Sequence, residues 1–98
     1  MPATSSKPLF PLGHVVATPG VGDTFLPEFV QQCLQRHLQG DWGDLDAEDK
    51  KANDDAVNPD APSYGNRILS VYVKGDEKLW IITEADRSAT CVLLPADY

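Results

Sequence analysis

Residues 68–94 read ILSVYVKGDEKLWIITEADRSATCVLL, and this stretch decides the fold. It contains three short runs rich in β-branched and aromatic residues, which is the composition of strands. A glycine with charged neighbours separates the first two runs, and a polar stretch separates the last two, as in tight turns. Three strands joined by such turns predict an antiparallel meander. The predicted strands are 68–73, 79–84 and 89–94.

The central predicted strand is apolar on both faces, because Trp80, Ile81 and Ile82 follow one another without a polar residue. An antiparallel strand with one wet face normally alternates apolar and polar residues. We therefore expect both faces of this strand to be covered. A helix can cover one face, and the other needs the N-terminal segment, a second helix or another subunit. The last alternative makes a homodimer one expectation from the sequence.

An amphipathic helix is predicted at residues 26–39. Pro27 suits the first helical position, Glu28 lies near the positive end of the helix dipole, and Gly40 marks the C-terminal stop. Apolar side chains recur at spacings of three and four, so they form a single stripe along the helix. The stripe consists of Leu26, Phe29, Val30, Cys33, Leu34, His37 and Leu38.

Two further elements precede the meander. Residues 14–18 predict a short strand, and residues 19–22 have the composition of a turn. A second helix is predicted at 47–57 with Asp46 as its N-cap, and its few apolar residues place it on the surface. Together these elements predict an α+β fold: an antiparallel sheet of three or four strands, an amphipathic helix packed on it, and an acidic helix outside.

The chain has 98 residues, enough for one domain at 9–98 preceded by a flexible arm at 1–8. Its content of 42% hydrophobic and 23% charged residues is typical of globular proteins. No apolar run approaches the roughly 20 residues of a membrane span, and the N-terminus lacks the apolar segment of a signal peptide. We therefore expect a cytoplasmic protein that does not contact membranes.

The charge is concentrated in one part of the chain. Eight Lys and Arg against fifteen Asp and Glu give a net charge of −7, which argues against direct binding to nucleic acid. Residues 41–60 hold eight of the acids and two of the bases. Such a patch can dock a basic surface of another protein or imitate a phosphate backbone, or it can be a solvated helix face. Its candidate binding residues are Asp44, Asp46, Glu48, Asp49, Asp54 and Asp55.

A second candidate site lies between the last two predicted strands. Glu84 and Asp86 are candidates for paired carboxylates, beside an Arg87 that would hold an anionic group. The alternative is an ordinary turn, in which Asp86 accepts bonds from its own loop and Arg87 pairs with Glu84. His37 and Trp42 complete the candidate set, because an aromatic ring beside mixed charges can line a pocket.

The two cysteines offer a metal site only in combination with histidines. Cys33 and His37 are four residues apart on the predicted helix, a spacing that can place two ligands on one metal, and His14 and Cys91 would complete the set. No CxxC or HxxxH pair supports this site. A reactive cysteine needs a partly exposed niche, whereas Cys33 falls on the apolar stripe. We therefore predict reduced core cysteines, no metal, no cofactor and no catalytic residue.

Several of these stretches resemble a family of small bacterial proteins of similar length that are carried on plasmids and integrative elements. Members are described as hypothetical or plasmid-related proteins, and some are labelled type I restriction subunit M. The resemblance spans most of residues 9–98 and departs at residues 57–66 and in the N-terminal arm. The matching stretches are PLG at 11–13 with VATPG at 16–20, RHLQGDWG at 36–43, EDKKAN at 48–53, ILS at 68–70, and WIITEADRS at 80–88 with LLP at 93–95.

The resemblance implies a cytoplasmic protein of mobile or accessory DNA, and it carries no catalytic residue over to this chain. The shared pattern runs through two polar stretches, residues 37–43 and 83–88. If the two stretches lie close together, they form one polar site or a network that braces the loops.

These features favour a small non-catalytic protein-binding or regulatory module that serves a mobile element. An acidic DNA mimic that inhibits a host nuclease or restriction system is one alternative, and it predicts competition with DNA and steep salt dependence. A small enzyme or ligand-binding domain is the other, and it predicts a pocket.

Overall fold

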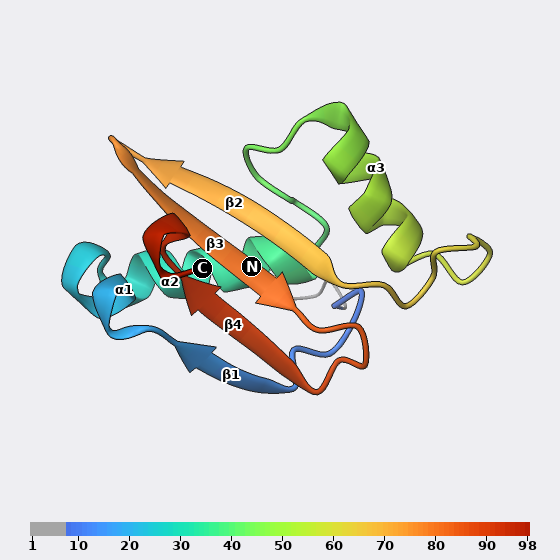
Figure 1. Cartoon of the computed structure of the whole chain (residues 1–98), viewed down its shortest axis with the longest axis horizontal. Helices are drawn as coiled ribbons and strands as arrows, with labels where there is room; N and C mark the ends of the chain where they lie inside the picture. The colour runs from blue at the N-terminus through green and yellow to red at the C-terminus, as the bar shows by residue number, and fades with distance from the viewer. Residues whose placement is uncertain (1–7) are drawn as a thin grey trace, which may run out of the picture.

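A four-stranded sheet organises the chain in the computed structural model, which describes residues 8–98 (Figure 1). The strand order is β1-β4-β3-β2. The last three strands of the chain pair antiparallel as predicted, whereas β1 pairs parallel with β4. The predicted α+β class is therefore confirmed, and the sheet is mixed. The strands are β1 (His14–Ala17), β2 (Ile68–Lys74), β3 (Glu77–Thr83) and β4 (Ala89–Leu93).

Strand β1 joins the sheet through backbone bonds at both of its ends. The His14 N–H donates to the Ser88 carbonyl over 2.9 Å, and the Thr18 N–H donates to the Val92 carbonyl over 3.0 Å. A parallel pair is possible here because a long helical segment separates β1 from the other strands, whereas a short hairpin would force antiparallel pairing. The arm predicted at residues 1–8 lies outside the described residues apart from Pro8.

Three α-helices and a short 3-10 helix complete the fold of residues 8–98. The predicted amphipathic helix is confirmed with Pro27 at its start, and the Asp46 carboxylate caps the acidic helix by accepting the Asp49 N–H over 2.8 Å. The turn predicted at residues 19–22 is wrong: a helix begins at Pro19, and burial of Val21 outweighs its two glycines. No helix within residues 8–98 has the length and apolar character needed to cross a membrane. The helices are α1 (Pro19–Thr24), α2 (Pro27–Leu38), α3 (Ala47–Ala56) and η2 (Pro95–Asp97).

Helix α2 closes one face of the sheet, and it runs behind the strands in Figure 1. Its Cys33 and Leu34 belong to the same buried cluster as Leu79 and Ile81 of β3 and Val92 of β4. Burial raises the pKa of the Cys33 thiol to about 11, so this thiol stays protonated at neutral pH. The prediction that Cys33 is a core residue is confirmed.

A smaller apolar cluster lies beside the first and holds α3 to the molecule. It contains Phe10, Trp42, Ala56 and Ile68, which come from four separate parts of the chain. Of the residues in α3, only Asn53 and Ala56 are buried. The predicted position of this acidic helix on the surface is confirmed.

The outer edge of β2 is covered by hydrogen-bonding groups from the segment that leads into α3. The Val71 N–H donates to the Trp42 carbonyl over 3.1 Å, and the Asp44 N–H donates to the Val71 carbonyl over 2.6 Å. Gly43 sits between them with φ of 79°, and a Cβ there would overlap the Val71 backbone. The Asn53 amide exchanges two further bonds with the Leu69 backbone, of 2.6 Å and 3.2 Å.

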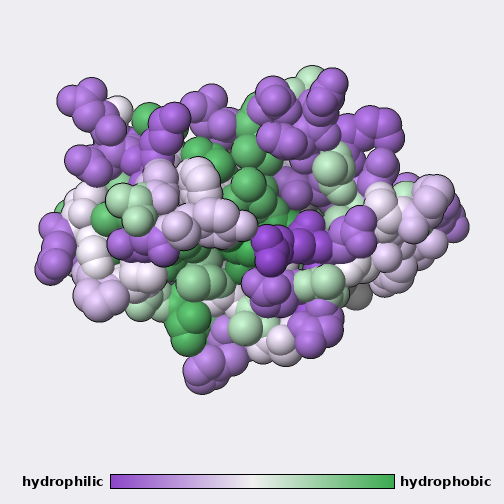
Figure 2. All heavy atoms as spheres, viewed as in Figure 1, coloured by the Kyte–Doolittle hydropathy of each residue, from purple (hydrophilic) through white to green (hydrophobic). Residues whose placement is uncertain are grey.

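The face of the sheet opposite α2 carries an apolar band, which Figure 2 shows as a green strip crossing the strands. The pairing register places Val16, Cys91, Ile82 and Leu69 in one row, and alternation along the strands adds the remaining members. We call this surface the open face, and it consists of Val16, Leu69, Val71, Val73, Trp80, Ile82, Cys91 and Leu93.

The open face is covered in part by the C-terminal residues. The Tyr98 ring contacts the Trp80 ring edge-on, with 5.4 Å between their centres. Val16 and Val73, at opposite ends of the band, remain 44% and 46% exposed. Cys91 is only partly buried on this face, so the prediction of a core position is wrong for this cysteine.

Candidate functional site

A line of polar side chains crosses the closed face of the sheet beneath α2. The fully buried His37 places its Nδ1 2.5 Å from the Ser70 hydroxyl and its Nε2 2.9 Å from the Thr83 hydroxyl. The Thr83 hydroxyl lies 2.8 Å from that of Thr90, which donates to the Leu12 carbonyl over 2.7 Å. We call these four side chains and the carbonyl the buried polar line.

The direction of each bond in the buried polar line follows from counting protons, because each hydroxyl has only one to donate. The Thr90 proton goes to the Leu12 carbonyl, so the Thr83 hydroxyl donates to Thr90. Thr83 then accepts the Nε2–H of His37. The other ring nitrogen, Nδ1, accepts the Ser70 hydroxyl proton. His37 is therefore held neutral, with its proton on Nε2.

Burial, with a smaller contribution from the charge of Arg87, lowers the pKa of His37 to about 3. The ring is therefore uncharged at neutral pH, and both of its nitrogens are engaged. The place of His37 on the apolar stripe is confirmed, but the prediction that it lines a pocket is wrong, because both ring nitrogens are bonded to hydroxyls of strands distant in sequence. Within residues 8–98 no three or more His, Cys, Asp or Glu side chains are grouped to hold a metal ion.

Trp42 is also buried, and it does not line the cavity described below. Its side chain is 3% exposed and its ring stacks on Phe10, with 6.3 Å between ring centres. The indole N–H donates to the Asp54 carboxylate over 2.8 Å. Trp42 thus packs as a core residue and tethers α3.

The two polar stretches at residues 37–43 and 83–88 lie close together. His37 of the first stretch contacts Thr83 of the second, and Phe10 lies within ring-contact distance of both His37 and Arg87. Of the two arrangements the pattern left open, the structure shows the bracing network, since the contact between the stretches is buried.

The acidic patch divides into engaged and free carboxylates. Asp46 caps α3, Asp54 accepts the Trp42 indole, and Asp55 pairs with Lys51 at 2.9 Å. Among residues 8–98, no side chain is hydrogen-bonded or ion-paired to the carboxylates of the remaining three candidates, and all three are exposed. These free acids are Asp44, Glu48 and Asp49.

The turn between β3 and β4 does not bring Glu84 and Asp86 together as a carboxylate pair. Asp86 accepts the Ser88 N–H over 3.0 Å and the Ser88 hydroxyl over 2.6 Å, and these bonds hold the pKa of Asp86 below its usual range. The Glu84 carboxylate faces Arg67 at 3.7 Å. The predicted Arg87–Glu84 side-chain pair is therefore wrong, and Arg87 instead donates to the Glu84 carbonyl over 3.1 Å.

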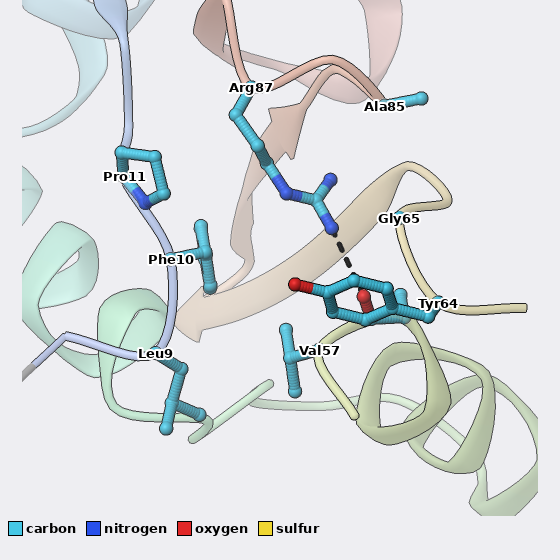
Figure 3. A pocket seen from close by; sticks show the side chains of 9 residues that line it. Leu9, Phe10, Pro11, Val57, Tyr64, Gly65, Ala85 and Arg87 are labelled. Atoms are coloured by element: carbon cyan, nitrogen blue, oxygen red, sulfur yellow. Dashed lines mark hydrogen bonds between the residues drawn. The ribbon is translucent and has the colours of Figure 1, made fainter. Parts of the chain in front are cut away.

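A cavity of about 250 Å³ lies beside this turn, and the Arg87 guanidinium extends into it (Figure 3). Sequence reasoning identified Arg87 but missed the other walls, which carry no motif and meet only in the folded chain. The walls are formed by residues 9–11, by Ala56 and Val57 at the end of α3, by Tyr64 and Gly65, and by Ala85.

Comparison of the chain with protein-family models, with curated proteins and with solved structures gave no match. The family resemblance drawn from the sequence stays a prediction.

Proposed function

We propose that the chain is a small non-catalytic protein-binding module whose docking surface is the open face of its sheet. The observation that carries the proposal is the apolar band on the face that α2 leaves uncovered. Its ends at Val16 and Val73 are exposed and Trp80 is partly exposed between them, whereas Val71, Ile82 and Leu93 are buried. Contiguous exposed apolar surface with a polar rim is characteristic of interaction sites. The polar candidates His37, Trp42 and Asp86, in contrast, are tied into bonds that brace the fold.

The charge beside the band defines the chemistry of the partner. Helix α3 flanks β2, and Figure 2 shows hydrophilic side chains over α3 bordering the green band. The free acids Asp44, Glu48 and Asp49 belong to this segment of the chain. We propose a partner segment with apolar side chains flanked by Lys or Arg. Charge complementary to the acids would speed association and fix the position of the segment along the band.

Engagement of half of the acidic patch favours this role over imitation of DNA. Only three of the six candidate carboxylates are free of intramolecular bonds, and a DNA mimic has to present a long row of charges. The sequence resemblance alone suggests that this module serves a mobile element.

The proposal is tested by two variants that place the same charge on opposite faces of β1. Val15 and Val16 are 41% and 44% exposed, and the pairing register places Val15 on the α2 side and Val16 on the open face. The probe is a synthetic peptide of alternating Leu and Lys, with binding followed by tryptophan fluorescence. We expect Val16→Lys to weaken binding about tenfold, because its charge repels the peptide, and Val15→Lys to leave it nearly unchanged.

A second arm tests the charge. The double change Glu48→Gln with Asp49→Asn should weaken peptide binding about threefold and reduce its salt dependence. Equal affinities for the Val15→Lys and Val16→Lys proteins would contradict the proposal. Displacement of the peptide by short duplex DNA would also contradict it.

A further inference from the structure

The cavity beside the β3–β4 turn contains a cation without a negative partner. No carboxylate among residues 8–98 lies within 4 Å of the Arg87 guanidinium, whereas Arg36 pairs with Asp41 at 2.7 Å and Arg67 faces Glu84 at 3.7 Å. Partial burial lowers the pKa of Arg87, which marks the charged form as poorly solvated. An anion that entered the cavity would restore the interactions that this charge has lost.

The fold holds the Arg87 side chain in place by its backbone and by neutral acceptors. Arg87 has φ of 59°, in the left-handed region that few arginines adopt. Its guanidinium donates to the carbonyl oxygens of Asn66, Glu84 and Ala56 over 2.7, 3.1 and 3.2 Å. These carbonyls fix the direction of the group without neutralising its charge, so the site is formed before any ligand arrives.

Counting N–H groups shows which part of Arg87 remains available. A guanidinium has five N–H donors. Nη1 makes two of the three bonds and Nη2 makes one, so the Nε–H and one Nη2–H have no acceptor among residues 8–98. The Nε–H lies on the edge of the guanidinium that also carries one of the two Nη2–H groups, and this edge matches the two oxygens of a carboxylate. Arg36 uses this same edge to hold Asp41, through Nε at 2.7 Å and Nη2 at 3.3 Å.

The remaining walls are mostly apolar. The Phe10 ring centre lies 5.7 Å from the Arg87 guanidinium carbon, and Leu9 and Val57 add aliphatic surface. Figure 3 shows the Tyr64 ring lying across the cavity from Phe10, below the guanidinium. The volume of about 250 Å³ lies below the range of about 300–1,000 Å³ that is usual for ligand pockets, so the ligand is small.

We propose that this cavity binds a small organic carboxylate, with the free edge of Arg87 on the carboxylate and Phe10, Val57 and Tyr64 around its apolar body. The proposal does not rest on the open face, and either can fail without the other. The carboxylate belongs to a free small acid or to the C-terminus of a peptide, because both present the same group.

The test is a titration of isotope-labelled protein followed by its amide NMR signals. Benzoate represents a free acid and N-acetyl-leucine a peptide C-terminus, and benzamide and N-acetyl-leucine amide are their uncharged counterparts. We expect saturable shifts at residues 9–11, 64–66 and 85–88 with at least one acid, and at least tenfold weaker shifts with its amide. The acid that binds more tightly identifies the source of the carboxylate.

Three variants connect the binding to Arg87. Arg87→Lys keeps the charge but loses the two parallel N–H donors that bind a carboxylate, so it should weaken binding about tenfold. Tyr64→Ala alters an exposed wall without threatening the fold and should weaken binding about threefold. Arg67→Lys, outside the cavity, should leave the affinity unchanged. Equal shifts from acid and amide, no saturable shift with either acid, or full affinity in both Arg87→Lys and Tyr64→Ala would overturn the proposal.

Discussion

The two faces of the sheet differ in which side chains they bury and which they expose. On neither face does the polarity of the side chains predict their exposure. The closed face contains the buried polar line of His37, Ser70, Thr83 and Thr90, yet none of these side chains reaches solvent. The open face is almost wholly apolar, yet Val16 and Val73 are exposed at its ends. A line of polar residues thus braces an otherwise apolar interior, and apolar residues are exposed at both ends of the open face. The polarity of a side chain is therefore a poor guide to whether it is buried in this sheet.

The largest effect expected from this comparison is the loss of His37. A His37→Leu change removes the ring from two buried hydroxyl partners, and a buried polar group left without a partner costs about 1–3 kcal/mol. We expect the free energy of unfolding in urea to fall by about 2–4 kcal/mol. Val16→Ala on the open face is the matched control, with a loss below about 1 kcal/mol. Similar losses of unfolding free energy in the two variants would contradict the proposed difference between the faces.

Low pH should also destabilise the protein through His37 of the closed face. The pKa of His37 is about 6.5 in the unfolded chain and about 3 in the folded protein, so the unfolded state binds a proton first as the pH falls. Stability is therefore greatest above about pH 6.5 and declines below it, by up to about 1.4 kcal/mol per pH unit. Urea unfolding at about pH 7, 6 and 5 measures the slope, and a His37→Gln protein should lack most of it. Equal slopes in the two proteins would contradict the neutral, buried assignment.

The smallest expected effect sharpens the description of the open face. Tyr98→Ala removes the ring that contacts Trp80, at a cost below about 1 kcal/mol because Tyr98 is 72% exposed. Trp80 becomes more exposed, so its fluorescence should shift to longer wavelength while the buried Trp42 does not respond. The Leu–Lys peptide should bind about twofold more tightly, because more of the band is accessible. An unchanged emission spectrum would show that Tyr98 does not cover this surface in solution.

Local signals in the sequence were sufficient for most helices and strands. The spacing of apolar residues along α2, the Asp46 cap of α3 and the glycine in the β2–β3 turn each act within a few residues of the element they define. Their physical causes are local, so the sequence carries them without knowledge of the fold.

Long-range packing decided the features that the sequence did not reveal. Burial of Val21 makes α1 a helix although its glycines favour a turn, and β1 joins β4 in parallel across most of the chain length. His37 was expected to line a pocket, and the sequence did not reveal its partners Ser70 and Thr83 because they lie on strands far along the chain. The Arg87 cavity needs walls from the N-terminus and from the end of α3, which no spacing in the sequence brings together.

The covering of β2 has a consequence for assembly. Trp42, Asp44 and Asn53 occupy the backbone groups of Leu69 and Val71, so this end of the sheet offers no template for another strand there. Strand β1, at the opposite end, is exposed along its length. Each molecule therefore has one free sheet edge, which is β1. Two molecules that paired through β1 would leave no free edge for a third. Association by strand pairing would then stop at a closed pair and could not propagate into a fibre.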